Sequence, residues 1–479
     1  MRTTSKHRAL CSALILATAG AATPLSARAE EELPRGQIVD KLECAADSQQ
    51  SYALYLPSGY ARTHPWPILY LFDPSANGKR AVETFKKAAE TYGFILAGSN
   101  NSKNGPWGVS LAAAQAMWRD ANRRFLLDDK RVYTSGWSGG ARVATNIAEL
   151  IAGSVAGVIG CGAGFPEDKP PTRDIKFAYF GLIGNTDFNY FELYGLGQSL
   201  EKLNLPYRIE VFAGPHQWPP EPYTLDALEW MRILEMDNGI AKDEKLIDVL
   251  LEKRRARAKE AEAAGDLVAA HQEYKAIARD FAPLRHVDDD AARAAELEKD
   301  ARLKKQLAAE EKVITAEKGT LERIYRSLDG FRAEPQAPPL TSLLQELHVE
   351  DLRKKAHQPE SEESRSATRL LTAIWVRSFF YLSQDAMERK DYNRAAYYLS
   401  VAVEIRPEIY DGWYNRACAW ALAGNRKKAL EDLRTAVERG YRDRAQMESD
   451  SDLTSLRGDE HFQEILRGPS NSSSPVTKP

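Results

Sequence analysis

Seven short apolar runs, separated by amphipathic segments, constrain what the first half of this chain can fold into. The runs are rich in β-branched and aromatic residues and have glycine, proline or asparagine near their ends. They cover residues 51–57, 66–72, 93–99, 131–137, 155–161, 177–184 and 207–214. The segments between them have the spacing of amphipathic helices. This alternation predicts an α/β domain whose mostly parallel sheet is covered by helices on both faces.

The composition changes near residue 237. From about residue 240 to residue 330 the chain consists largely of Ala, Glu, Lys, Arg and Leu and has no strand signal, which predicts long helices. The charge runs of these helices are expected to be solvated faces. Proline-rich residues 334–340 and polar residues 357–366 indicate a linker or loop across 334–366. The change predicts that residues 30–240 fold without the helices that follow.

The N-terminus has the pattern of a secretory signal. Arg2, Lys6 and Arg8 precede an apolar stretch, and small residues precede Glu30, so we expect cleavage after Ala29 and a secreted or periplasmic protein. The apolar stretch is short for a membrane span, and no later segment is long and apolar enough to form one. A formal net charge of -3 gives no sign of nucleic-acid binding.

A repeat lies in the C-terminal part. Residues 391–407 and 425–440 superpose with a shift of 34 residues, which maps Ala395 to Ala429, Leu399 to Leu433 and Ala402 to Ala436. This period and these residue types resemble tetratricopeptide helix pairs, and residues 264–281 resemble an earlier, degenerate unit. The resemblance implies an all-α helical repeat domain whose concave groove binds a protein segment.

The cysteines and the absence of metal-binding motifs place few constraints on the function. Cys44, Cys161 and Cys418 follow the signal, and two interpretations stay open: a Cys44–Cys161 disulfide, or three buried thiols. No HExxH or CxxC spacing is present, and neither is a G-x-G-x-x-G motif or a P-loop. The sequence therefore predicts neither a metal site nor a cofactor.

The segment Gly136-Trp137-Ser138-Gly139-Gly140 joins a predicted strand to a predicted helix. Small residues can serve close packing at such a turn. The alternative is a nucleophile elbow, G-x-S-x-G, whose strained turn exposes a serine hydroxyl. A nucleophilic serine needs a base, and histidine is the side chain suited to that role at neutral pH.

Only two histidines lie between residues 30 and 237. His64 precedes the strand predicted at 66–72, whereas His216 follows the carboxyl end of the last predicted strand. Catalytic groups of an open α/β sheet gather at the carboxyl ends of strands, so we expect His216 to be the base. Asp187 follows the strand at 177–184 and is the best-placed acid to orient it. The order Ser…Asp…His is that of one class of serine hydrolases and of neither chymotrypsin nor subtilisin.

With these residues in place, residues 45–237 resemble the α/β-hydrolase superfamily, near its secreted feruloyl esterase and polyhydroxybutyrate depolymerase-like branch. The resemblance rests on "YALYLPSGY", "RVYTSGWSGGARVA", "GLIGNTDFNY" and "GPHQWPP". It implies a serine esterase that cleaves a carboxylic ester through an acyl-enzyme, with Ser138, Asp187 and His216 as the triad. It carries no information on the substrate.

One departure from these esterases concerns the oxyanion hole. They usually carry His-Gly after the third strand, where this chain has Asp73-Pro74, and proline has no N–H to donate. We expect the Gly139 N–H to be one donor and the Ser75 N–H to be the second. Two further side chains placed to assist are Asn100 and Asn101.

Five aromatic residues flank the expected site in the sequence, and a place in the core explains each of them at least as well. They are Trp107, Trp137, Phe188, Tyr190 and Trp218, of which Trp137, Phe188 and Trp218 are expected to bind substrate. Two alternatives to an esterase stay open: a repeat-mediated interaction protein with a subordinate or inactive hydrolase domain, and a serine peptidase. The expected domains are a signal peptide (1–29), an α/β-hydrolase catalytic domain (30–237), a region of long helices or degenerate repeats (238–333), a linker or loop (334–366), helical repeats (367–467) and a disordered tail (468–479).

Overall fold

The computed structural model describes residues 33–467 except residues 167, 333 and 335. The chain forms two compact units, Met1–Glu311 and Lys312–Pro479. The predicted signal peptide and the predicted tail lie outside the described residues. Among the helices of the described part, none combines the length and the hydropathy that a membrane span requires.

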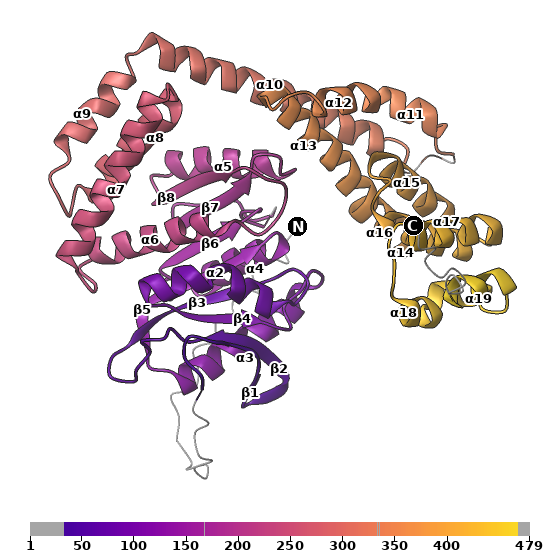
Figure 1. Ribbon diagram of the computed structural model, residues 1–479, viewed down its shortest axis with the longest axis horizontal. Coiled ribbons are helices and arrows are strands. Elements are labelled where there is room, and N and C mark those ends of the chain that lie inside the picture. Colours follow the sequence, from indigo (N-terminus) through magenta and orange to yellow (C-terminus); the bar gives the residue numbers. More distant parts are fainter. Residues whose placement is uncertain (1–32, 167, 333, 335, 468–479) are drawn as a thin grey trace, which may run out of the picture. The chain divides into compact units, whose positions relative to one another are not determined.

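An eight-stranded sheet forms the centre of the first unit (Figure 1). Its strands are β1 (Ile38–Cys44), β2 (Asp47–Tyr55), β3 (Trp66–Phe72), β4 (Ile95–Ser99), β5 (Leu127–Trp137), β6 (Gly157–Cys161), β7 (Ala178–Gly184) and β8 (Tyr207–Phe212). The order is β1-β2-β4-β3-β5-β6-β7-β8, and β2 runs antiparallel to both of its neighbours, whereas β3 to β8 are parallel. All seven predicted strands are present, and β1 was missed.

Five helices cover the sheet on its two faces. They are α2 (Gly78–Tyr92), α3 (Trp107–Arg124), α4 (Gly139–Leu150), α5 (Tyr190–Lys202) and α6 (Glu221–Asp237). Buried residues of α3, α4 and α5 belong to one core cluster, and those of α2 and α6 belong to another. This topology with helices on both faces is the α/β-hydrolase fold, and the predicted fold class is confirmed.

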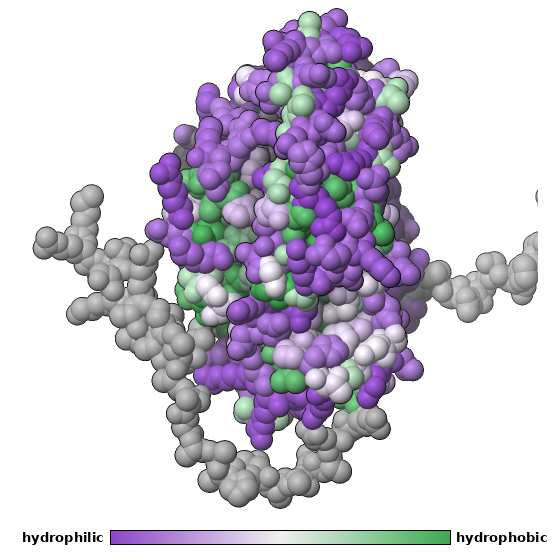
Figure 2. All heavy atoms as spheres, turned by 90° about the vertical axis from the view of Figure 1, so that its left-hand side faces the viewer, coloured by the Kyte–Doolittle hydropathy of each residue, from purple (hydrophilic) through white to green (hydrophobic). Residues whose placement is uncertain are grey.

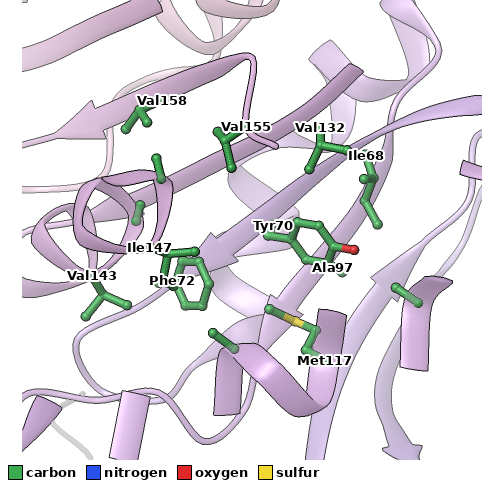
Figure 3. Close-up of a cluster of buried hydrophobic side chains, with 14 of the residues drawn as sticks. Ile68, Tyr70, Phe72, Ala97, Met117, Val132, Val143, Ile147, Val155 and Val158 are labelled. Carbon is green, nitrogen blue, oxygen red and sulfur yellow. The ribbon is translucent and has the colours of Figure 1, made fainter. Parts of the chain in front are cut away.

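The third strand shows why its sequence is apolar throughout. Ile68, Tyr70 and Phe72 pack with residues of α3 and α4 (Figure 3), while Leu69 and Leu71 pack with residues of α2 and α6. Successive side chains of a strand point to opposite faces. A strand buried on both faces therefore needs an uninterrupted apolar run, which is what the sequence shows at 66–72.

The helices that follow residue 237 belong to the same unit as the sheet. They are α7 (Glu244–Ala263), α8 (Leu267–Phe281), α9 (Asp288–Leu297) and the start of α10 (Ala301–Asp329). Figure 2 shows the molecule from the side of α7 to α9, and the surface seen there is mostly hydrophilic. This is expected where runs of charged residues face the solvent. The boundary expected at residue 237 therefore falls inside the first unit, and the end of that unit lies at Glu311.

Buried ion pairs join the sheet to these helices. Arg208 on β8 lies 2.7 Å from Glu210 and 2.8 Å from Glu273 on α8. Arg254 on α7 also pairs with Glu273. All four side chains are buried, so Glu273 neutralises two arginines that come from different layers of the unit. Independent folding of residues 30–240 does not fit this arrangement, because the truncation removes Glu273, which pairs with the buried Arg208 of β8.

Replacing Glu273 by alanine is expected to lower the free energy of unfolding by about 3–5 kcal/mol, because it leaves the buried Arg254 without a carboxylate. Urea unfolding of the full chain, followed by circular dichroism, measures the change. The control is Glu260→Ala at an exposed position of α7, where a change within about 0.5 kcal/mol is expected. Equal effects of the two substitutions would mean that the buried network does not stabilise the first unit.

The second unit is helical throughout its described part. It comprises most of α10 and then α11 (Leu340–Glu346), α12 (Val349–Ala356), α13 (Glu362–Val376), a π-helical turn (Arg377–Leu382), α14 (Ser383–Glu388), α15 (Tyr392–Ile405), α16 (Tyr410–Leu422), α17 (Arg426–Glu438), α18 (Arg444–Ser449), a 3₁₀ turn (Ser451–Leu456) and α19 (Glu460–Arg467). The alanines matched by the repeat lie on α15 and α17 and are fully buried. Tetratricopeptide character stays a prediction.

The linker or loop expected at 334–366 is wrong for much of its length, because α11 and α12 lie inside it. Leu343, Leu347, Val349 and Leu352 of this segment are buried in a core cluster with α13 and α15. The flanking proline-rich and polar residues obscured these four apolar positions in the sequence. Packing against other helices, rather than local composition, orders the segment.

Candidate active site

Ser138 occupies the sharp turn between β5 and α4. Its φ of 54° and ψ of -123° are rarely adopted by residues other than glycine, and such strain costs about 1–3 kcal/mol. The turn requires glycine on both sides: a Cβ on Gly136 would overlap the carbonyl oxygen of Gly140, and one on Gly140 would overlap that of Phe72. The Ser138 amide donates to the carbonyl of Cys161 on β6 at 2.8 Å. This is the geometry of a nucleophile elbow.

Asp187 follows the carboxyl end of β7 and His216 that of β8, and the two side chains form a hydrogen-bonded pair. His216 Nδ1 lies 2.8 Å from Asp187 Oδ2. The Asp187 side chain is fully buried, whereas His216 keeps 15% of its surface exposed. The second oxygen of Asp187 accepts the Asn189 backbone N–H at 2.8 Å. Because the carboxylate accepts at Nδ1, that nitrogen carries the proton and Nε2 is left as the acceptor.

A short stretch of backbone brings this pair to the serine. Cys161, which accepts the Ser138 amide, is followed by Gly162, and a Cβ on Gly162 would lie 3.0 Å from His216 Cε1. On the other side, the rings of Trp137 and His216 have their centroids 5.0 Å apart. The imidazole therefore lies beside the residues that hold the elbow. The structure places Ser138, Asp187 and His216 at the same carboxyl edge of the sheet.

Asp73 connects the loop after β3 to the loop that carries the histidine. Its carboxylate is 2% exposed. One oxygen accepts the indole N–H of Trp218 at 2.9 Å, and the other accepts the backbone N–H of Ser75 at 2.8 Å. Because Trp218 follows His216 by two residues, Asp73 ties the two loops together. Its position after β3 was noted in the sequence, but its role depends on a partner 145 residues away.

The expected oxyanion donors are only partly available. The Gly139 N–H lies in the first turn of α4, where N–H groups have no partner within the helix. The Ser75 N–H is already bound to Asp73, so its prediction as the second donor is wrong. Asn100 and Asn101 donate instead to backbone carbonyls of β1 and β2, at 3.1 and 3.0 Å. Their side chains fix strands rather than assist at the site.

The aromatic residues divide into two groups. Trp137 and Phe188 are half-buried and flank the imidazole, with the Phe188 ring centroid 4.5 Å from that of His216. The guanidinium of Arg80 lies 5.8 Å from the centroid of Trp137. Trp218 is 6% exposed and belongs to a core cluster, so its predicted contact with substrate does not fit the structure.

The three cysteines of the described residues are buried free thiols, the second of the two interpretations. Burial raises the pKa of Cys44 and of Cys161 to about 12. Cys161 is next to the elbow, but a thiol with such a pKa stays protonated at neutral pH and is a poor nucleophile. Ser138 therefore has no competing thiolate beside it.

Three side chains in the second unit bring potential metal-ligand atoms close together. Cys418, Asp450 and Asp452 offer atoms within 4.8 Å of one another. Tyr414 donates to Asp450 Oδ2 at 2.7 Å, and the Cys418 thiol lies 3.8 Å from the same oxygen. Burial raises the pKa of Cys418 above its ordinary value, which favours the neutral thiol over a metal ligand. We assign no metal to this group.

Comparisons with solved structures find a hydrolase and esterases that each cover about two fifths of this chain. S-formylglutathione hydrolase from Staphylococcus aureus has 16% identity and a TM-score of 0.34, covering 42% of this chain and 98% of that chain. A carboxylesterase from Mesorhizobium loti has 16% identity and a TM-score of 0.33, covering 40% and 99%. A ferulic acid esterase has 17% identity and a TM-score of 0.32, covering 40% and 94%. No family model and no curated protein matches the sequence.

Proposed function

We propose that this chain is a serine hydrolase that cleaves a carboxylic ester through Ser138, His216 and Asp187. The observation that carries the proposal is the coincidence of two independent features. Ser138 is held in a strained turn that only flanking glycines permit, and a buried carboxylate orients His216 beside the residues that hold that turn. Strain of this kind persists where the surrounding structure maintains it, which is common at active sites.

The mechanism that we propose is acyl transfer through a covalent intermediate. Ser138 Oγ attacks the ester carbonyl carbon while His216 Nε2 takes its proton, and Asp187 stabilises the imidazolium that forms. The imidazolium then protonates the leaving alkoxide, so that the alcohol departs and an acyl-enzyme remains. Water, deprotonated by Nε2, attacks the acyl carbonyl, and the proton returns to Ser138 as the acid is released. The Gly139 N–H stabilises the oxyanion in both steps.

We further propose export to a secreted or periplasmic location, with Glu30 as the first mature residue, on the basis of the signal pattern in the sequence.

The second unit is proposed to bind a protein segment or a macromolecular substrate. A groove of about 680 Å³ supports such binding; its lining combines charges of both signs with apolar side chains, namely Arg434, Arg442, Arg444, Glu438, Glu464, Val437 and Ile465. Such a mixture suits a partner that presents both charged and apolar residues.

A panel of small substrates distinguishes the candidate functions. We expect the purified mature protein to hydrolyse 4-nitrophenyl butyrate, with a kcat within the range of about 1–10³ s⁻¹ common for enzymes, and to leave the matched 4-nitroanilide intact. Cleavage of the anilide at a comparable rate would favour a peptidase. Failure to cleave esters, lactones and anilides alike would favour the alternative of an interaction protein with an inactive hydrolase domain.

A further inference from the structure

Residues 74–76 of the loop after β3 do not supply the second oxyanion donor that acyl transfer requires. Pro74 has no N–H, and the N–H of Ser75 is engaged by the buried carboxylate of Asp73 at 2.8 Å. The next amide, that of Ala76, donates to the Asp73 carbonyl at 3.2 Å. An oxyanion held by Gly139 alone would lack a donor whose loss costs other hydrolases about 10²–10³-fold in kcat.

Asn104 brings a carboxamide to this place from the loop between β4 and α3. A Cβ on Gly139 would overlap Asn104 Oδ1 and would lie 3.0 Å from its Cγ and 3.5 Å from its Nδ2. The side chain therefore lies against the residue whose N–H is the first donor. Rotation about the terminal torsion, which is broad and two-fold for asparagine, presents either the oxygen or the NH₂ group.

Backbone contacts hold Asn104 beside the loop after β3, where residues 74–76 offer no oxyanion donor. Its N–H donates to the Pro74 carbonyl at 2.8 Å, and Lys103 pairs with Ser75 in an isolated bridge. The 103–104 backbone thus runs beside the loop after β3. Within the described residues the Asn104 carboxamide forms no hydrogen bond, and its side chain is exposed. Its NH₂ group is available to an atom that arrives with the substrate.

We propose that the Asn104 side-chain NH₂ group is the second oxyanion donor, acting together with the Gly139 N–H. The inference rests on the proposed serine hydrolase function. In the tetrahedral intermediate the carbonyl oxygen becomes negative and accepts hydrogen bonds from both N–H groups. When the intermediate collapses, the carbonyl double bond re-forms and the C–O bond to the alcohol breaks. The donor therefore acts most strongly in the transition state, and its removal lowers kcat rather than raising KM.

The test is the kinetics of Asn104→Ala in the full mature chain with 4-nitrophenyl butyrate. We expect kcat to fall by about 10²–10³-fold with KM within about threefold of wild type. Asn104→Asp keeps the shape but replaces a donor by an acceptor, so its kcat is expected to be at least as low as that of the alanine variant. The matched control is Asn122→Ala on α3, whose carboxamide donates to a carbonyl of its own helix at 2.9 Å, and we expect wild-type kinetics from it.

A second measurement separates an oxyanion donor from a residue that only supports the loop. Affinity for a trifluoromethyl ketone, which forms a tetrahedral adduct with the serine, should fall in Asn104→Ala by about the same factor as kcat/KM, at an unchanged melting temperature. A kcat within threefold of wild type, a loss confined to KM, or unchanged ketone affinity overturns the inference.

Labelling with a fluorophosphonate makes failure of the two proposals distinguishable. Wild-type protein labelled at Ser138, combined with an unaffected Asn104→Ala, overturns the role of Asn104 and leaves the serine hydrolase proposal intact. Wild-type protein that is neither labelled nor active toward esters overturns the proposed function and the inference together.

Discussion

Replacing Ser138 by alanine is expected to abolish labelling of the chain by a fluorophosphonate and to lower kcat on 4-nitrophenyl butyrate by about 10⁴-fold or more. The reason is that the acyl-enzyme cannot form without the hydroxyl at the elbow, while the oxyanion donors remain and retain a small residual rate. Labelling is read by mass spectrometry of the modified peptide, and kcat by release of 4-nitrophenolate.

The control for this substitution is Ser75→Ala, an exposed serine in the loop after β3. The change removes only a hydroxyl and keeps the backbone N–H that Asp73 holds, so labelling should match that of wild type. Equal labelling of Ser138→Ala and wild type would show that another residue is the nucleophile. The folded state of both variants is checked by circular dichroism, because alanine at residue 138 must keep a φ of 54°.

Replacing His216 by alanine is expected to lower kcat by a similar factor, about 10⁴-fold or more. The imidazole lies beside the residues that hold the elbow, and the Asp187 carboxylate lies 2.8 Å from its Nδ1. Triad members act as a unit, so the double variant with Ser138→Ala should be about as slow as either single variant.

His64 offers the matched control. It is exposed and stacks on Trp66 at the opposite, N-terminal end of β3, with ring centroids 4.7 Å apart. His64→Ala is expected to keep kcat within about twofold of wild type. Loss of activity in His64→Ala together with retention in His216→Ala would refute the assignment of the base.

Local sequence patterns predicted most of the first unit. The seven apolar runs and the helices between them lie where the patterns placed them, because strand and helix periodicities are properties of neighbouring residues. The sequence analysis missed strand β1, which lies at the edge of the sheet and carries the exposed charged residues Asp40, Lys41 and Glu43. An edge strand is ordered by its one neighbour, and its own sequence carries a weak apolar signal.

The sequence also predicted one part of the candidate site and missed another. The placement of Asp187 and His216 followed from a rule of topology, that the ends of parallel strands meet at one edge. The second oxyanion donor did not follow, since the sequence analysis chose Ser75, with Asn100 and Asn101 as assisting side chains, and did not consider Asn104. Only the hydrogen bonds of the folded chain show that three of these groups are occupied and that Asn104 lies against Gly139.

The sequence by itself determined the alternation of strands and helices, the glycine-flanked serine and the acid and histidine that follow later strands. The tertiary structure alone decided that the first unit continues beyond residue 237, because Glu273 neutralises arginines of β8 and α7 that no local pattern connects to it. It also decided that Asp73 ties two loops and that Trp218 is buried. The physical reason is that periodicity and backbone strain arise between neighbours along the chain. Burial of a charge and occupancy of a hydrogen-bond donor depend on partners that only folding brings together.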